Sequence, residues 1–226
     1  MDKKRWIIFL GLTMSFMVAL VVFSKSNTVD ISKLDINNVL PAKSDNGNIG
    51  DHVYGNPKSP VTVINYTNLQ CSGCASSHPA IKAVTELYKD KIKFVSRFMH
   101  LPSHTNGKAA QGSAEAAGLQ GKFWEMSDIL YGSQNEWSML SGTQRTDYFK
   151  NIAKTLDLDT DKFLVDLESS AVSKKMDFDN SLGHKALVNA TPTFFINGVM
   201  LQLTDIKQFT EAIDAELVKA DIEPPK

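Results

Sequence analysis

The sequence contains only two cysteines, Cys71 and Cys74, which form a C-x-x-C with Ser72 and Gly73 between them. A disulfide across so short a loop constrains the unfolded chain little, so a structural crosslink explains the pair poorly. Two adjacent thiols can instead exchange disulfides or bind a soft metal. A closed zinc site uses four ligands, and the sequence has no second cysteine pair. The spacing therefore favours a redox-active pair over a metal site.

The predicted elements around the pair place its first cysteine at the start of a helix. Residues 61–66 (VTVINY) form a β-rich apolar run that is typical of a buried strand. A helix with an apolar stripe is predicted from Cys71 onward, with Pro79 inside it. Because helix N-terminal N–H groups stabilise a thiolate, we expect Cys71 to have a lowered pKa and to be the attacking thiol. Cys74, one turn later, should be more shielded and should resolve mixed disulfides.

The rest of the chain predicts a layered α/β domain over residues 56–222. Residues 92–99 (IKFVSRFM) form a second strand and complete a strand–helix–strand unit. Helical patterns fill residues from about 105 to 186 and predict an inserted helical subdomain. Strands at 193–196 and 199–203, joined by Asn-Gly, precede a last amphipathic helix. We therefore expect one mixed sheet with helices on both faces.

The N-terminal residues indicate the compartment in which the domain works. A positive cluster of Lys3, Lys4 and Arg5 precedes the uncharged run Trp6–Phe23. As a helix, this run would be roughly 27 Å long, enough to cross a membrane with the positive cluster in the cytoplasm. A cleaved signal peptide is the alternative, and it would place the domain in the same compartment.

Residues 1–24 are accordingly predicted to be a membrane anchor or signal sequence, and the polar residues 25–55 a tether. We expect a single-pass protein of the cell membrane with its C-terminal domain on the periplasmic or extracellular face, or a secreted protein if the segment is cleaved. The 24 Lys and Arg residues balance 25 Asp and Glu residues, so no large basic field indicates a nucleic-acid partner.

Three stretches together resemble the DsbA-like branch of the thioredoxin superfamily. They are VTVINYTNLQCSGCASSHP, HTNGKAAQGSAEAAGLQGKFWEMSDILY and VNATPTFFINGV, and they occur in the family's order. The resemblance implies a thioredoxin fold with a helical domain inserted between its βαβ and ββα halves. It also implies protein thiol–disulfide oxidoreductase activity, with the Cys71–Cys74 pair as the redox centre, no other cofactor and no metal.

The resemblance assigns roles to individual residues. Cys71 matches the nucleophilic cysteine and Cys74 the resolving one. Thr191-Pro192 matches the cis-proline loop that faces the active site, where the backbone of Thr191 would pair with an extended substrate peptide.

Four residues near the thiols are candidates for tuning the redox chemistry. Relatives often have Pro followed by His or Tyr between the cysteines, whereas this chain has Ser72 and Gly73. Relatives often have Asp where this chain has Asn68, so a nearby carboxylate is missing. His78, on the predicted active-site helix, could act on the thiols electrostatically.

The predicted function is therefore the oxidation of dithiols in secreted or envelope proteins, with a membrane redox partner that recycles the cysteine pair. A disulfide reductase or isomerase on the same site is an alternative. A Cu(I)-binding chaperone that uses the same thiols is an alternative of a different class.

Overall fold

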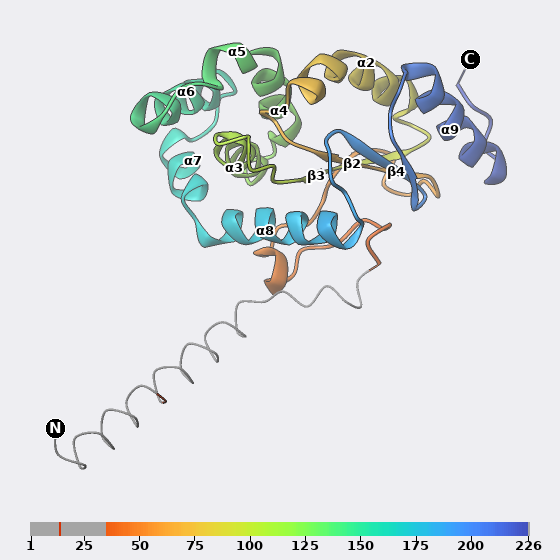
Figure 1. Cartoon of the computed structure of the whole chain (residues 1–226), viewed down its shortest axis with the longest axis horizontal. Helices are drawn as coiled ribbons and strands as arrows, with labels where there is room; N and C mark the ends of the chain where they lie inside the picture. Colours follow the sequence, from red (N-terminus) through yellow and green to blue (C-terminus); the bar gives the residue numbers. More distant parts are fainter. Residues whose placement is uncertain (1–13, 15–34, 226) are drawn as a thin grey trace. The chain divides into compact units, whose positions relative to one another are not determined.

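The computed structural model describes Met14 and residues 35–225, and residues 35–225 contain a five-stranded mixed sheet with helices on both faces (Figure 1). The strand order is β1-β3-β2-β4-β5. Only the central pair β2–β3 is parallel among these strands, and the other pairs are antiparallel. The strands are β1 (His52–Gly55), β2 (Thr62–Thr67), β3 (Lys93–Phe98), β4 (Thr193–Ile196) and β5 (Val199–Leu201).

Helices α2 (Ser72–Tyr88) and α9 (Ile206–Lys219) cover one face of the sheet, and α8 (Ser170–Lys185) covers the other (Figure 1). The helices between β3 and α8 form the inserted subdomain. They are α3 (Gly107–Gly118), α4 (Phe123–Gly132), α5 (Gln134–Trp137), α6 (Gly142–Thr155) and α7 (Thr160–Leu167). A short 3₁₀ helix, η1 (Ser44–Asn46), contacts α8.

Two hydrophobic clusters form the cores of the sheet region and of the insert. The first lies between the sheet and helices α2 and α9, and includes Val63, Phe194 and Phe209. The second fills the insert around the fully buried Trp137 and Phe149. Five of the six residues of β2 are buried, which is typical of a central strand that is covered on both faces.

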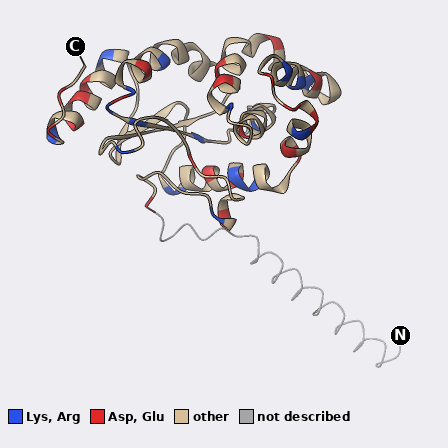
Figure 2. Ribbon diagram, turned by 180° about the vertical axis from the view of Figure 1, so that it is seen from behind, with Lys and Arg blue, Asp and Glu red and all other residues tan. Residues whose placement is uncertain are grey.

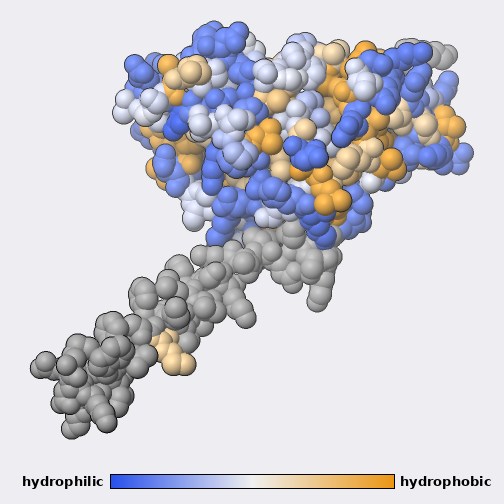
Figure 3. Space-filling view, in the orientation of Figure 1, coloured by the Kyte–Doolittle hydropathy of each residue, from blue (hydrophilic) through white to orange (hydrophobic). Residues whose placement is uncertain are grey.

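The predicted order of elements is confirmed. The strand expected at 92–99 is β3, and the helical region expected at about 105–186 consists of the insert, α3 to α7, followed by α8. The last two strands and the final helix follow as expected. The surface of the domain carries both signs of charge on most helices (Figure 2), and apolar residues lie in small groups among hydrophilic ones on the face in Figure 3.

The boundary between tether and domain needs correction, because residues 35–55 belong to the folded domain. Residues 52–55 form β1, which pairs antiparallel with β3. Leu40 and Ile49 are buried, and Asp51 pairs with Arg97 of β3. The polar composition of this segment indicated a tether. Its Asp51, however, is buried and paired with Arg97, which is distant in the sequence. The remaining part of the predicted tether, residues 25–34, lies outside the described residues.

Within the described part of the chain, no helix is both long and apolar enough to cross a membrane. The span predicted at Trp6–Phe23 lies outside the described residues, as does nearly all of the segment 1–24. The anchor or signal sequence therefore stays a prediction.

Candidate active site

The two cysteines lie where the loop after β2 enters α2. Cys71 is the N-cap residue of α2, and Cys74 lies in its first turn, so the predicted helix start is correct to within one residue. Both are free thiols, with exposed fractions of 8% for Cys71 and 3% for Cys74. The first cysteine is thus the more accessible of the two, as the roles of attacking and resolving thiol require.

The two thiols have opposite pKa shifts. A hydrogen bond from the Cys74 thiol is the main cause that lowers the pKa of Cys71 to about 5; burial opposes it, and Thr191 and backbone N–H groups of Gly73 and Cys74 assist. The same hydrogen bond, together with burial, raises the pKa of Cys74 far above that of a free thiol. At neutral pH, Cys71 is therefore a thiolate and Cys74 a protonated thiol.

The loop that contains Pro192 lies directly against the nucleophile. The Thr191-Pro192 peptide bond is cis, and the Thr191 carbonyl oxygen lies 3.3 Å from Cys71 Sγ. The buried Thr191 hydroxyl has no hydrogen-bond partner among the described residues, and its proximity lowers the pKa of both cysteines. The adjacency that the predicted substrate site requires is present, while its role in binding stays a prediction.

Gly73 keeps the space between the cysteine and the cis-proline loop open. A Cβ atom at this position would lie 3.7 Å from Cys71 Sγ, 3.9 Å from the Thr191 oxygen and 4.0 Å from Pro192 Cδ. These are ordinary van der Waals distances, so a small side chain would fit but would cover the sulfur. Ser72 is exposed beside it.

Asn68 hydrogen-bonds to backbone groups of the neighbouring loops, whereas a residue that tunes the thiols was expected to contact them. Its fully buried side chain donates to the Met99 carbonyl oxygen at 2.9 Å and accepts from the Gln70 N–H at 3.0 Å. It also packs against Gly107, where a Cβ would lie 2.4 Å from Asn68 Oδ1. The side chain therefore fixes the loop before Cys71, and its effect on the thiols is indirect.

His78 lies on α2 and contacts the insert rather than the sulfurs. Its Nε2 atom is 2.8 Å from Asp128 Oδ1 on α4, and its ring lies 4.4 Å from the ring of Tyr131. The Tyr131 hydroxyl hydrogen-bonds to Thr67 Oγ1, and the Thr67 hydroxyl lowers the pKa of Cys74. Sequence reasoning missed Thr67, Asp128 and Tyr131, because only the folded insert brings them together.

The insert also holds the active-site loop through two glutamines that the sequence did not single out. Gln134 of the insert donates to the carbonyl oxygens of Leu69 and Cys71 at 2.7 and 3.2 Å. Gln70 donates to the carbonyl oxygen of Ser138 at 2.9 Å. The neighbouring Met139 is 89% exposed, so an apolar side chain faces solvent next to the residue that Gln70 contacts.

An open groove of about 340 Å³ runs along the other side of the site, between α2 and the start of α9. Pro192 and Gly73 lie at its end nearest the cysteines. Its remaining lining residues are Ser77, Ala80, Ile81, Leu203, Thr204, Asp205 and Ile206. The groove could therefore hold a chain segment that continues past Cys71.

Comparisons with solved structures agree with this arrangement. The structure of α-DsbA1 from Wolbachia pipientis is 25% identical, with a TM-score of 0.65 over 76% of this chain and 92% of that chain. BdbD from Bacillus subtilis is 20% identical, with a TM-score of 0.64 over 80% of this chain and 98% of that chain, and shows the shared fold.

Curated relatives match the chain over part of their length. The Na(+)/H(+) antiporter NhaA 1 of Salinispora arenicola is 36% identical over 151 residues, which are 66% of this chain and 22% of the relative. The antiporter NhaA of Herminiimonas arsenicoxydans is 29% identical over 166 residues, 73% of this chain and 25% of the relative. The chain thus spans about a quarter of the length of these relatives.

A family model described as thioredoxin matches residues 47–215. The matched region contains both cysteines, the cis-proline loop, all five strands and the helical insert. The chain therefore belongs to the thioredoxin family, and its fold is that of the DsbA-like branch.

Proposed function

We propose that this protein is an extracytoplasmic thiol–disulfide oxidoreductase that oxidises pairs of thiols in secreted or envelope proteins. The observation that carries the proposal is the lowered pKa of Cys71, about 5, beside the raised pKa of Cys74. A thiolate that is stabilised at neutral pH stabilises the reduced pair. A disulfide whose reduced form is stabilised is a stronger oxidant, so the asymmetry favours donation of the disulfide to substrates.

The proposed reaction begins from the Cys71–Cys74 disulfide. A substrate thiolate attacks Cys71 Sγ and forms a mixed disulfide, while the Cys71–Cys74 bond breaks and Cys74 leaves with the electron pair and takes up a proton. A second substrate thiolate then attacks the substrate sulfur of the mixed disulfide. Cys71 leaves as a thiolate, for which its low pKa makes it suited. The substrate gains a disulfide, and the cysteine pair gains two electrons.

The proposed substrate is an extended, cysteine-containing segment of a protein. The Thr191 carbonyl lies beside Cys71 Sγ, where a strand-like peptide would find a backbone partner. The groove between α2 and α9 adjoins this carbonyl on one side, and the exposed Met139 belongs to the segment that Gln70 ties to the active-site loop. Backbone pairing with shallow apolar contacts suits a protein that acts on many sequences.

We further propose that the domain is tethered to the outer side of the cytoplasmic membrane. The support is the positive cluster Lys3–Arg5 before the uncharged run Trp6–Phe23. Disulfides persist outside the cytoplasm, where a newly formed one would be stable. A membrane redox partner would reoxidise the cysteine pair after each turnover.

A reductase or isomerase on the same site is the second candidate. Ser72 and Gly73 favour it, because neither adds a positive charge that would stabilise the thiolate further. The two candidates differ in direction alone, and both use Cys71 as the attacked or attacking sulfur.

The test is the oxidation of a reduced, unfolded multi-disulfide protein by the oxidised domain. The wild type should form substrate disulfides and become reduced. Cys74→Ser should accumulate a mixed disulfide on Cys71, while Cys71→Ser should lose the reaction with its stability retained. Substrate oxidation by Cys71→Ser at the wild-type rate would contradict the proposal. A wild type that only reduces disulfides would support the second candidate instead.

A further inference from the structure

A cavity of about 470 Å³ lies beneath α2, between α4 and the sheet. Apolar side chains such as Leu69, Ile81 and Trp124 form much of its wall. Polar side chains interrupt them, and two of these have unpartnered atoms. Asn65 Oδ1 and both amide atoms of Gln111 are buried and lack a hydrogen-bond partner among the described residues. Gln111 is only 1% exposed. The Gln111 amide lies near enough to Glu115 to lower the pKa of that carboxyl, but it forms no hydrogen bond with it.

Buried polar atoms of this kind are normally satisfied by protein or by ordered water. The cavity has room for several water molecules, and the unpartnered atoms of Asn65 and Gln111 line it. A polar, roomy cavity holds water, whereas a purely apolar one stays dry. The cavity is therefore suited to carry protons.

Two hydroxyl groups connect Cys74 with this cavity. Thr67 comes from the end of β2, close enough to Cys74 for its hydroxyl to lower the pKa of that thiol. On its other side, Thr67 Oγ1 hydrogen-bonds to the Tyr131 hydroxyl. Tyr131 lines the cavity, and burial raises its pKa well above that of a free tyrosine. A tyrosine that stays neutral can pass a proton only by giving one and receiving another together.

His78 and Asp128 form an acid–base pair beside Tyr131, and all three residues line the cavity. The His78 ring packs on the Tyr131 ring, and Asp128 accepts a hydrogen bond from His78 and also pairs with Lys82. The other acidic or basic groups that line the cavity are Tyr54 and Glu125. The Tyr54 hydroxyl is bound to Glu86, and Glu125 to Lys122, so neither faces Tyr131 as His78 does.

The proposed reaction needs a proton at Cys74. When substrate attacks Cys71, Cys74 leaves as a thiolate, and a thiolate of high pKa leaves slowly unless it is protonated as the bond breaks. Cys74 is 3% exposed, so bulk water does not reach its sulfur freely.

We propose that Thr67 and Tyr131 pass protons between Cys74 and the water-filled cavity, where His78, oriented by Asp128, exchanges them with solvent. As Cys74 leaves, Thr67 gives its hydroxyl proton to the sulfur, Tyr131 replaces the proton of Thr67, and cavity water replaces that of Tyr131. A protonated His78 returns a proton to the cavity water and then takes up another proton from solvent. In the reverse reaction each proton moves the other way. The inference rests on the proposed function, because it concerns a step of that exchange.

The test compares the rate at which a small dithiol reduces the oxidised protein in wild type and in Tyr131→Phe. The variant keeps the ring against His78 and removes only the hydroxyl. We expect it to react at least about tenfold more slowly, which is within the range for loss of proton transfer. The pKa of Cys71 in the reduced variant should be unchanged. Tyr148→Phe is the matched control, since it removes a hydroxyl that binds the exposed Glu136, and should react like wild type.

A second pair of variants separates a proton path from a packing effect. His78→Gln keeps a donor for Asp128 but cannot exchange a proton, so it should react more slowly, as Tyr131→Phe does, and added imidazole should restore part of the rate. Thr67→Ser should retain the wild-type rate, and Thr67→Val should lose it as Tyr131→Phe does. These variants also cover the case in which Tyr131→Phe folds poorly.

A rate equal to that of wild type in Tyr131→Phe or in His78→Gln would overturn the proton path. A slower Tyr131→Phe whose Cys71 pKa has shifted in parallel would also overturn it, because the hydroxyl would then act on the nucleophile. A wild type that does not exchange with the dithiol at all would instead refute the proposed function.

Discussion

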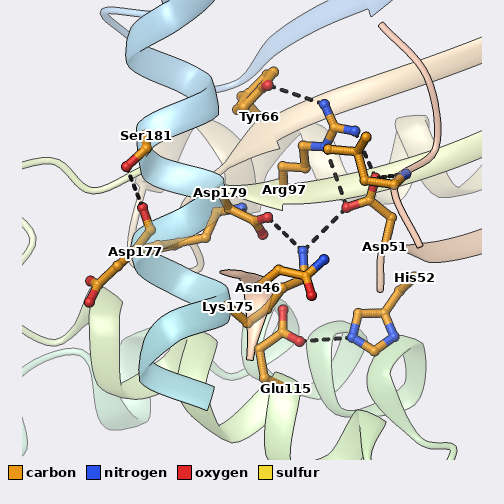
Figure 4. A network of polar contacts seen from close by, with 12 residues as sticks. Asn46, Asp51, His52, Tyr66, Arg97, Glu115, Lys175, Asp177, Asp179 and Ser181 are labelled. Atoms are coloured by element: carbon orange, nitrogen blue, oxygen red, sulfur yellow. Dashed lines mark hydrogen bonds and ion pairs between the residues drawn. The ribbon is translucent and has the colours of Figure 1, made fainter. Parts of the chain in front are cut away.

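The molecule buries titratable groups on both faces of its sheet, and the two regions are built differently. On the α8 face, Asp51, Arg97, Lys175 and Asp179 are at most 1% exposed, and each has an oppositely charged partner (Figure 4). On the α2 face, Cys71 and Cys74 have pKa values that move apart, and polar atoms of Asn65, Gln111 and Thr191 lack partners among the described residues.

The ion cluster on the α8 face holds its charges in fixed states. Arg97 binds Asp51 at 2.7 Å, and Lys175 bridges Asp51 at 3.2 Å and Asp179 at 2.6 Å. Arg97 also donates to the carbonyl oxygens of Ile36 and Asn38, so the cluster fastens the N-terminal segment of the domain to β3 and α8. Asp179 is the exception, because burial raises its pKa to about 6.

The difference shows how buried polarity separates stability from chemistry in one domain. Charges that are paired with each other resist a change of protonation, which suits a structural role. Groups that share one hydrogen bond, or that border a polar cavity, change protonation during a reaction. We therefore expect substitutions on the α8 face to change stability, and substitutions on the α2 face to change exchange rates.

The largest effect is expected for Asp51→Asn. This change leaves Arg97 and Lys175 with one carboxylate fewer in a buried site, and breaking a buried pair costs about 3–5 kcal/mol. Urea unfolding of the reduced domain would measure the loss. The folded fraction should still exchange disulfides at the wild-type rate. An unchanged free energy of unfolding would contradict the structural role of the cluster.

Asp179→Asn should cost less, about 1–3 kcal/mol, because an amide oxygen can still accept from Lys175. Burial is the largest cause that raises the pKa of Asp179 from 3.8 to about 6, so the fold favours its protonated form. Its contribution to stability is therefore greatest below its unfolded pKa and is lost as the pH rises from about 3.8 to about 6. The free energy of unfolding of the wild type should therefore fall with pH across this range, and in the variant this slope should be absent. Equal slopes in both proteins would argue against the raised pKa.

Thr191→Val tests the other region. The variant keeps the shape of the side chain and removes the hydroxyl that lowers the pKa of Cys71. A stabilisation of the thiolate as large as one net hydrogen bond, ~1 kcal/mol, would correspond to roughly fivefold in the thiolate equilibrium. We expect a higher Cys71 pKa and a weaker oxidant, with urea stability unchanged within error. Ultraviolet absorbance of the thiolate during a pH titration measures the shift, and an unshifted titration would remove Thr191 from the set of tuning residues.

The smallest effect is expected for Asp177→Asn, a matched control on the same helix as Asp179. Asp177 is 64% exposed and pairs with the exposed Lys108. Exposed pairs contribute little, so the free energy of unfolding should change by less than about 0.5 kcal/mol. A loss of stability comparable with that of Asp51→Asn would mean that exposed and buried ion pairs contribute equally to the stability of this domain.

The sequence predicted the parts of the molecule that depend on local pattern. The strands beside Cys71, the helix that it caps, the helical insert and the Thr191-Pro192 loop all follow from periodicity, turn residues and motif order. The domain start was missed because Asp51 is stabilised by Arg97 and Lys175, which lie 46 and 124 positions away.

Long-range contacts also explain what was missed at the site. Asn68 looked like a neighbour of the thiols, but its amide binds the Met99 backbone across the sheet edge. His78 carried a signal as a histidine on the active-site helix, whereas its partners Asp128 and Tyr131 come from the insert. Local pattern does not predict which face of α4 meets α2, so the polar chain from Cys74 to the cavity was visible only in the fold.

The measurement that tests the central claim most directly is the equilibrium redox potential of the Cys71–Cys74 pair in glutathione buffers. The opposite pKa shifts of the two thiols predict a potential well above the value of about −270 mV that thioredoxin has. Such a value would identify a donor of disulfides. A potential near or below that of thioredoxin would contradict the oxidising role and would identify a reductase that needs electrons from a membrane partner.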